Sequence, residues 1–331
     1  PSLQWRIGPT SQSTHEIRNV PLAGHPGAGK TTLFEALLHA GGAIGVAGTI
    51  ERGNTVSDHD PIERQRGHSI DAAIASVDHR AADGRRVHLT LVDTPGYPEF
   101  RGPALAALDA VETVVVVVDA VNGVEHGTRR LMARARERDL CRAIVVNRID
   151  AEGADCAGVL EALREEFGPE VLPLNLPADG GAKVVDCFGQ SGGGSDLGPV
   201  ADWHQKAMDR VGEINESVMD RYLELGEEGL SGEELHDAFE QCMREGHLVP
   251  VCFASARTGT GVRKLLDVAA RLFPHPGEGN PPPFLKGQGD DAVPLALSPD
   301  PDAHVVADVF RIVNDPFVGK LTFFRLYSGV L

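Results

Sequence analysis

Short apolar stretches alternate with longer helical stretches from residue 16 to about residue 272. Most of the apolar stretches are continuous rather than interrupted by polar residues, which is typical of strands that are covered on both faces. They lie at 17–23, 87–92, 114–118, 143–146 and 248–253. This alternation predicts an α/β domain with a mostly parallel sheet.

One pair of predicted strands departs from the parallel pattern. Residues 70–77 and 86–92 flank Ala82-Asp83-Gly84, a turn sequence that favours a β-hairpin. We therefore expect one antiparallel strand in the sheet.

The pattern changes after residue 272, where the chain becomes rich in proline and glycine. Beyond this stretch, 305–313 and 321–327 predict two strands. Two strands are too few to close a barrel, so we expect a truncated second domain and a chain that is a fragment of a longer protein. The expected division is a tail at 1–13, a first domain at 14–272, a linker at 273–303 and the start of a second domain at 304–331.

Composition and charge narrow the class of protein. The 331 residues are 42% hydrophobic and 24% charged, as in globular proteins rather than disordered or fibrous ones. No apolar stretch reaches the roughly 18 residues of a membrane helix, and the N-terminus lacks a signal-peptide pattern. The five cysteines contain no CxxC pair, which argues against disulfides and a zinc knuckle. We expect a cytoplasmic monomer without a membrane partner.

The net charge of −17 argues against a general nucleic-acid coat but leaves room for a local basic contact. The residues Arg64, Arg66 and His68 form a short basic cluster that suits RNA. In contrast, residues 212–240 hold ten acidic side chains and one basic one, Arg221.

The strongest motif is Gly24-His25-Pro26-Gly27-Ala28-Gly29-Lys30-Thr31, which fits the phosphate-binding pattern G-x-x-x-x-G-K-[ST]. It follows the first predicted strand and precedes a predicted helix at 31–39. Backbone N–H groups of such a loop surround phosphate oxygens, and the helix N-terminus adds a positive dipole. Lys30 would reach the β and γ phosphates, and the Thr31 hydroxyl would hold Mg²⁺. The alternative is a glycine-rich turn with an exposed lysine.

A second loop, Asp93-Thr94-Pro95-Gly96, ends the strand predicted at 87–92. Asp93 can hold Mg²⁺ through water, and the Gly96 N–H can meet the γ phosphate. A β-turn explains these four residues equally well. Their place at the carboxyl end of a strand beside the phosphate loop favours a ligand site.

Two further loops predict recognition of guanine. In Asn147-Arg148-Ile149-Asp150, the Asp150 carboxylate can accept hydrogen bonds from guanine N1–H and N2–H, a donor pair that adenine lacks. Asn147 can reach the O6/N7 edge and brace the phosphate loop, and the stem of Arg148 can cover the base. In Ser255-Ala256, a backbone N–H can meet guanine O6. A polar loop after a strand is the alternative interpretation.

Together these motifs resemble those of translational GTPases, and of elongation factor G most closely. The matching segments are 18–32, which ends in Lys30-Thr31-Thr32, Arg66-Gly67-His68-Ser69-Ile70, Asp93–Gly96, 147–150, Ser255-Ala256 and 315–324. The resemblance implies a P-loop GTPase fold followed by a β-barrel domain. It also implies Mg²⁺ as cofactor, GTP and GDP as substrate and product, and a ribosome-linked step of translocation, rescue or recycling.

The resemblance further implies an inserted subdomain at about 171–244. A helix and a strand need roughly 25–30 residues, whereas 108 positions separate Asn147 from Ser255. In elongation factor G an insert at this point faces stalk proteins of the ribosome. The acidic segment 212–240 lies in it, and a solvated acidic helix face is the alternative interpretation.

Four positions depart from elongation factor G. Gly27 stands where aspartate is usual, and Arg148 stands in place of lysine. Ser69 replaces a Mg²⁺-binding threonine, and its hydroxyl can still serve as a ligand. Tyr97 replaces the histidine that positions the attacking water, as in elongation-factor-G-like paralogues; packing against Pro26 as an apolar gate is the alternative.

The implied catalytic residues are Lys30, Gly96 and Tyr97, and the implied metal ligands are Thr31, Ser69 and Asp93. We expect a slow GTPase because a tyrosine hydroxyl is a poor base. Two alternatives stay open, a GTP-sensing module with negligible hydrolysis and a relative of the tetracycline-protection or release-factor type. The guanine-reading loop argues against a third, a P-loop ATPase or kinase.

Overall fold

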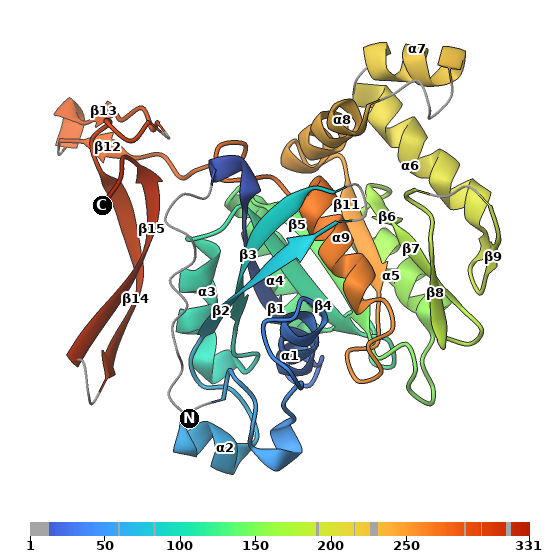
Figure 1. The fold of residues 1–331 in the computed structure, drawn as a ribbon, viewed down its shortest axis with the longest axis horizontal. Coiled ribbons are helices and arrows are strands. Elements are labelled where there is room, and N and C mark those ends of the chain that lie inside the picture. Colours follow the sequence, from blue (N-terminus) through green and yellow to red (C-terminus); the bar gives the residue numbers. More distant parts are fainter. Residues whose placement is uncertain are drawn as a thin grey trace.

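The computed structural model describes residues 13–58, 60–81, 84–189, 192–214, 216–225, 231–287, 289–298, 300–315 and 319–331. Its centre is a seven-stranded sheet with the order β2-β3-β1-β4-β5-β11-β6 (Figure 1). Strand β2 pairs antiparallel with β3, and the other neighbours pair in parallel. The strands are β1 (Ile17–Gly24), β2 (Ala73–Arg80), β3 (Arg86–Asp93), β4 (Thr113–Asp119), β5 (Cys141–Asn147), β6 (Val171–Pro173) and β11 (Val249–Phe253). The predicted fold class is confirmed.

Strand β4 shows why these strands are apolar throughout. Val115 and Val117 point into one hydrophobic core, and Val114, Val116 and Val118 point into a second core on the opposite face. Helices cover both cores, so no position on the strand faces water. The first core includes α1 (Lys30–Ala40) and α9 (Val262–Leu272), and the second includes α3 (Arg101–Leu108), α4 (His126–Glu137) and α5 (Cys156–Phe167).

Strand β2 begins three residues later than the pattern predicts. The backbone N–H groups of Ile70 and Asp71 donate to the buried carboxylate of Glu63 instead of joining the sheet. Glu63 belongs to α2 (Pro61–Arg66), so this short helix holds the segment that leads into the strand. In the predicted hairpin turn, Ala82 and Asp83 lie outside the described residues.

The segment between β5 and β11 adds strands and helices at one end of the sheet (Figure 1). Its first strand, β6, pairs with β11 and extends the central sheet. The remaining elements are β7 (Asn175–Ala178), β8 (Lys183–Asp186), β9 (Gly194–Ser195), β10 (Gly198–Pro199), α6 (Val200–Ile214), α7 (Glu216–Leu225) and α8 (Gly232–Arg244). Short 3₁₀ turns occur at Thr14–Glu16, Ile50–Arg52, Pro98–Phe100 and Gly289–Asp291. No helix in the described ranges is long and apolar enough to cross a membrane.

The C-terminal part forms a long hairpin of β14 (Val306–Asp315) and β15 (Gly319–Ser328) at the opposite end of the molecule (Figure 1). A smaller pair, β12 (Leu285–Lys286) and β13 (Val293–Pro294), precedes it within the predicted linker. The residues 316–318 of the predicted turn lie outside the described residues.

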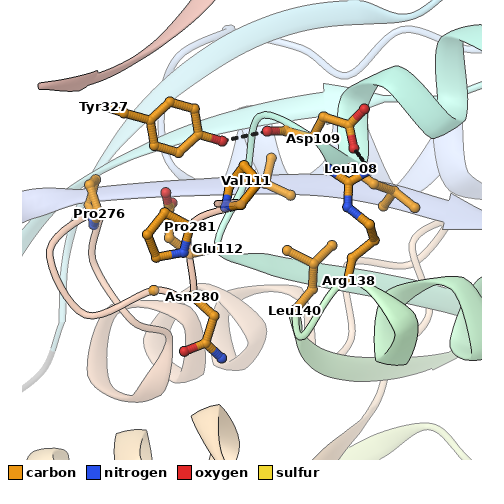
Figure 2. Close-up of a pocket in the computed structure, with 12 residues that line it drawn as sticks. Leu108, Asp109, Val111, Glu112, Arg138, Leu140, Pro276, Asn280, Pro281 and Tyr327 are labelled. Atoms are coloured by element: carbon orange, nitrogen blue, oxygen red, sulfur yellow. Dashed lines mark hydrogen bonds and ion pairs between the residues drawn. The ribbon is translucent and has the colours of Figure 1, made fainter. Parts of the chain in front are cut away.

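Polar contacts attach this hairpin to the first domain. The Tyr327 hydroxyl donates to the Asp109 carbonyl, and the two line a pocket of about 20 Å³ together with Arg138 and Pro281 (Figure 2). Arg325 donates to the buried carboxylate of Glu112 at 2.5 Å. Such a pocket has room for about one water molecule, so the two parts are closely packed here.

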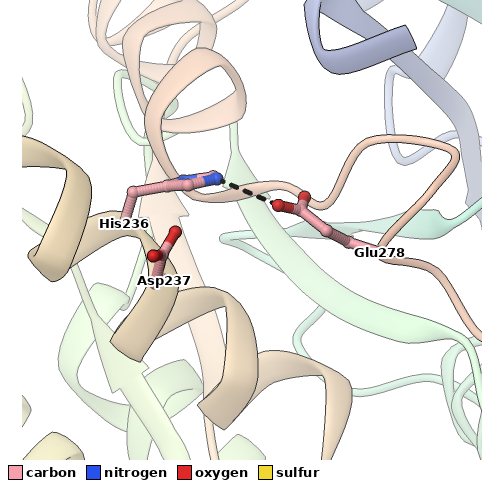
Figure 3. Close-up of side chains that lie close together, drawn as sticks. All are labelled: His236, Asp237 and Glu278. Atoms are coloured by element: carbon pink, nitrogen blue, oxygen red, sulfur yellow. Dashed lines mark ion pairs between the residues drawn. The ribbon is translucent and has the colours of Figure 1, made fainter.

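The carboxylate of Glu278 and two neighbouring histidines connect α8 to the segment after α9. Glu278 accepts a hydrogen bond from the His275 backbone N–H at 2.9 Å and lies 3.1 Å from the His275 Nε2 atom. On α8, the Nε2 atom of His236 lies 3.6 Å from the carboxylate of Glu278, and the next residue, Asp237, lies beside His236 (Figure 3). Burial alone raises the pKa of Glu278, but its polar contacts with His236 and His275 outweigh burial and hold this pKa well below its usual range.

This lowered pKa predicts a pH-dependent contribution to stability. Because the folded-state pKa lies below the unfolded value near 4.5, the contribution is present above pH 4.5 and is lost as the pH falls further. The Glu278→Gln variant should lose about 2 kcal/mol of unfolding free energy at pH 7 in urea denaturation, and its deficit should shrink below pH 4.5. As a control, Glu245→Gln, whose partner His247 is exposed, should change stability by less than about 0.5 kcal/mol. An equal deficit at pH 7 and at acid pH would contradict the ionic contribution.

Candidate functional site

A cleft of about 1120 Å³ opens at the carboxyl ends of β1, β3, β5 and β11. All four loops predicted from the sequence contribute to its lining. Parallel strands bring their carboxyl ends to one edge of the sheet, which explains why loops up to about 230 positions apart meet here. Among the lining residues are Pro26, Gly27, Gly29, Lys30, Thr31, Thr32, Ser69, Gly96, Tyr97, Asn147, Arg148, Asp150 and Ala256.

The glycine-rich loop turns sharply into α1. Gly29 adopts a left-handed conformation with φ of 84°, and a Cβ atom there would lie 2.5 Å from Nδ2 of Asn147. Only glycine therefore fits between the loop and Asn147 at the end of β5. The turn leaves the first backbone N–H groups of α1 directed into the cleft, where an anion is favoured.

The buried amide of Asn147 joins the two ends of the cleft. Its Nδ2 donates to the Ala28 carbonyl at 3.0 Å, and its Oδ1 accepts from the Ala256 N–H at 3.0 Å. This N–H is one of the two backbone N–H groups of Ser255-Ala256 from which the sequence predicted a contact with guanine O6. In the structure it is satisfied by Asn147 because a buried N–H without a partner is costly.

Lys30 lies at the centre of the phosphate cradle, with 6% of its surface exposed. Its Nζ atom donates to the carbonyls of Gly24 at 3.1 Å and His25 at 3.0 Å. Burial lowers the pKa of Lys30 to about 8, although the negative charges of Asp93 and Glu125 oppose this shift. A desolvated ammonium group of this kind gains strongly from an incoming anion.

Three oxygen donors predicted as metal ligands lie together beside the lysine. Thr31 Oγ1 donates to Asp93 Oδ2 at 2.7 Å and lies 3.2 Å from Ser69 Oγ. The second oxygen of Asp93, Oδ1, is buried without a hydrogen bond of normal geometry in the described part of the chain. Hydroxyl and carboxylate oxygens are the ligands that Mg²⁺ prefers, so this donor set fits the ion.

Burial raises the pKa of Asp93 to about 7, although the Thr31 hydrogen bond and the charge of Lys30 act in the other direction. A nearby carboxylate, Asp58, adds to the rise and accepts a hydrogen bond from Ser69 at 2.8 Å. Negative charge is thus concentrated in a buried space, which a divalent cation would neutralise. Asp58 was not predicted, since it stands in a loop without a motif.

The base-reading loop lies at the other end of the cleft. Burial opposes ionisation of Asp150, but hydrogen bonds from Ser255 and Arg257 outweigh it and hold the pKa of Asp150 below its usual value. Arg257 donates to Asp150 Oδ2 at 2.7 Å. The loop therefore presents an ionised carboxylate, the form that accepts two N–H donors.

Arg148 has a left-handed backbone with φ of 66°, an uncommon conformation for a side chain of this size. Its guanidinium donates to the buried carboxylate of Asp119 at 2.6 Å. This ion pair holds the arginine stem along the wall of the cleft. Asp119 and Arg257 were not predicted from the sequence, although Asp119 ends a strand in the same way as Asp93 does.

Tyr97 lines the cleft with 40% of its surface exposed. Its ring contacts the ring of His68, with a centroid distance of 4.4 Å. The sequence grouped His68 with the arginines of a basic cluster, but the structure places it against an aromatic side chain. Pro26 lines the same cleft.

Comparison with known proteins extends these observations. The family model described as the elongation factor Tu GTP binding domain matches residues 15–275. An elongation factor G-like protein, in both the CDC 1551 and the H37Rv strain of Mycobacterium tuberculosis, is 34% identical over 338 aligned residues, which span 98% of this chain. The chain covers 46% of that relative's length.

A crystal structure of a protein from Thermus thermophilus superposes with a TM-score of 0.77 and 32% identity, covering 95% of this chain and 46% of the other. The family match covers the whole sheet and all four loops of the cleft. The chain therefore belongs to the translational GTPases that carry the elongation factor Tu GTP-binding domain, and within them it is similar to elongation factor G-like proteins.

Proposed function

We propose that this chain binds GTP with Mg²⁺ and hydrolyses it to GDP and phosphate in a ribosome-linked step of translation. The observation that carries the proposal is the pairing, within one cleft, of a buried lysine cradle with an ionised carboxylate at the base-reading end. The first feature suits a polyphosphate and the second suits guanine.

The phosphate end works by positioning and electrostatics. Lys30 and the N–H groups at the start of α1 would bind the β and γ phosphates, and the N–H of Gly96 would meet the γ phosphate. Gly96 approaches the lysine so closely that a Cβ atom would lie 2.4 Å from Nζ. Any side chain at position 96 would therefore push the ammonium group of Lys30 out of its place.

Thr31, Ser69 and Asp93 would hold Mg²⁺, directly or through water. When bound, the ion would neutralise charge on the phosphate oxygens. The segment Arg64–Ile70, which carries Ser69, would be ordered with GTP and relaxed with GDP.

The insert after β5 and the C-terminal hairpin would provide the contacts with partners and with a second domain. Residues 171–244 would form the inserted subdomain, and 304–331 the start of a second domain that packs on the first through Tyr327 and Arg325. Ribosomal RNA and stalk proteins are the proposed partners. The acidic surface of α6–α8 would suit a basic protein partner.

Turnover measurements test the function directly. The protein should release phosphate from GTP, more rapidly with ribosomes than without them, and EDTA should abolish the reaction. If ribosomes leave turnover unchanged, the ribosome-linked step is excluded. If GDP binds but no phosphate is released from GTP, the function is reduced to guanine-nucleotide binding.

Replacing the central lysine should remove the phosphate contact alone. Lys30→Met keeps the apolar stem of the side chain but loses the hydrogen bonds from its ammonium group to the phosphates. These hydrogen bonds are worth about 3 kcal/mol, so the affinity for GDP, measured by calorimetry, should fall roughly 100-fold. The fold should persist because the variant removes a buried charge. Lys183→Met, at an exposed lysine, is the matched control and should bind like the parent chain. Equal GDP affinity in both variants would exclude the phosphate cradle.

Changing the base reader should change the preferred base. Xanthine carries an acceptor where guanine carries N2–H, and an asparagine N–H can donate to it. Asp150→Asn should therefore weaken GTP binding by about 2–4 kcal/mol and reverse the preference toward XTP in competition assays. Asp179→Asn, at an exposed aspartate, should keep the preference for GTP. An Asp150→Asn variant that still prefers GTP would show that another group reads the base.

A further inference from the structure

The aromatic contact between His68 and Tyr97 brings two separate segments together at the cleft. His68 follows α2, and Tyr97 follows β3 and precedes the 3₁₀ turn Pro98–Phe100. The two rings lie with centroids 4.4 Å apart and planes inclined by 40°, and the ring of Phe100 lies 5.8 Å from His68. His68 thus rests on two aromatic rings that hold its orientation.

Neighbouring residues place this contact at the phosphate end of the cleft. The residue after His68 is Ser69, whose hydroxyl lies 3.2 Å from Thr31 Oγ1. The residue before Tyr97 is Gly96, whose backbone lies against Lys30. Both rings line the same cleft, so each is within one residue of a group that would surround the γ phosphate.

The hydrogen-bonding atoms of His68 are available at this position. Its Nδ1 atom has a long contact of 3.4 Å with the Ser69 carbonyl. No hydrogen bond to its Nε2 atom is formed by the described residues. A neutral imidazole offers one nitrogen acceptor and one N–H donor, and it is a better hydrogen-bond acceptor than a phenol oxygen.

We propose that His68 orients the water that attacks the γ phosphate, and that the ring of Tyr97 is its support. This inference rests on the proposed GTPase function. The water oxygen forms a bond to the γ phosphorus, and the bond from that phosphorus to the β–γ bridging oxygen breaks, leaving its electron pair on GDP. One water proton stays on the inorganic phosphate and the other passes to solvent. His68 accepts a hydrogen bond from the water and keeps no proton.

Two conservative variants separate this role from simple packing. His68→Phe keeps an aromatic ring on Tyr97 but removes the nitrogen atoms, so single-turnover GTP hydrolysis by the protein should fall at least tenfold. Tyr97→Phe removes the hydroxyl but keeps the supporting ring, so it should lose less of the rate than His68→Phe does. His247→Phe, at an exposed histidine outside the cleft, is the matched control and should hydrolyse GTP at the parent rate. GDP affinity and melting temperature should change little in these variants, since the proposed role concerns the attacking water and not GDP. Added imidazole should restore part of the rate of His68→Ala.

The outcomes distinguish the possible roles. If His68→Phe hydrolyses GTP at the parent rate, the inference is wrong. If Tyr97→Phe loses activity in the same assay while His68→Phe does not, the tyrosine hydroxyl positions the water. If His68→Phe changes only the ribosome concentration needed for half-maximal stimulation, His68 contacts RNA and the inference is again wrong. If the parent protein binds GTP but releases no phosphate, the proposed function fails and this inference fails with it.

Discussion

The side-chain amide of Asn147 connects the parts of the cleft on which ligand binding depends. It lies at the end of the buried strand β5, donates to the phosphate loop and accepts from the loop after β11. A buried amide must satisfy its donors and acceptor within the protein, so the two loops have one favourable spacing. Gly29 lets the phosphate loop approach this amide closely enough to bond with it. The distance between the phosphate end and the base end is set by these contacts.

Burial also decides the electrostatics of the cleft. The pKa of Lys30 is lowered to about 8 and that of Asp93 is raised to about 7, in each case chiefly because the charged form is poorly solvated. The charged forms of both groups are therefore poorly stabilised by the protein alone. An anionic ligand would stabilise the charged form of Lys30, and a divalent cation would stabilise that of Asp93. Ligand binding would stabilise the folded chain accordingly, since it compensates charges that the fold has already buried.

The segment between α2 and β2 connects this electrostatic centre to more distant parts. Ser69 bonds within the proposed metal site, Glu63 holds the next two backbone N–H groups, and Asp71 accepts from Arg311 of the C-terminal hairpin at 2.8 Å. The same segment carries His68 to Tyr97. These hydrogen bonds join the cleft to the hairpin through a few adjacent residues.

The amino-acid sequence by itself determined the fold class and most of the cleft. Continuous apolar strands such as 114–118 require cover on both faces, and short-range motifs such as Gly24–Thr31 carry their local geometry with them. The polar partners were decided only by tertiary structure: Asp58 meets Ser69, Asp119 meets Arg148, and Arg257 meets Asp150. These pairs join loops whose spacing along the chain leaves no local pattern. The contact between His68 and Tyr97 arises in the same way, because only the folded sheet brings the end of β3 beside the segment after α2.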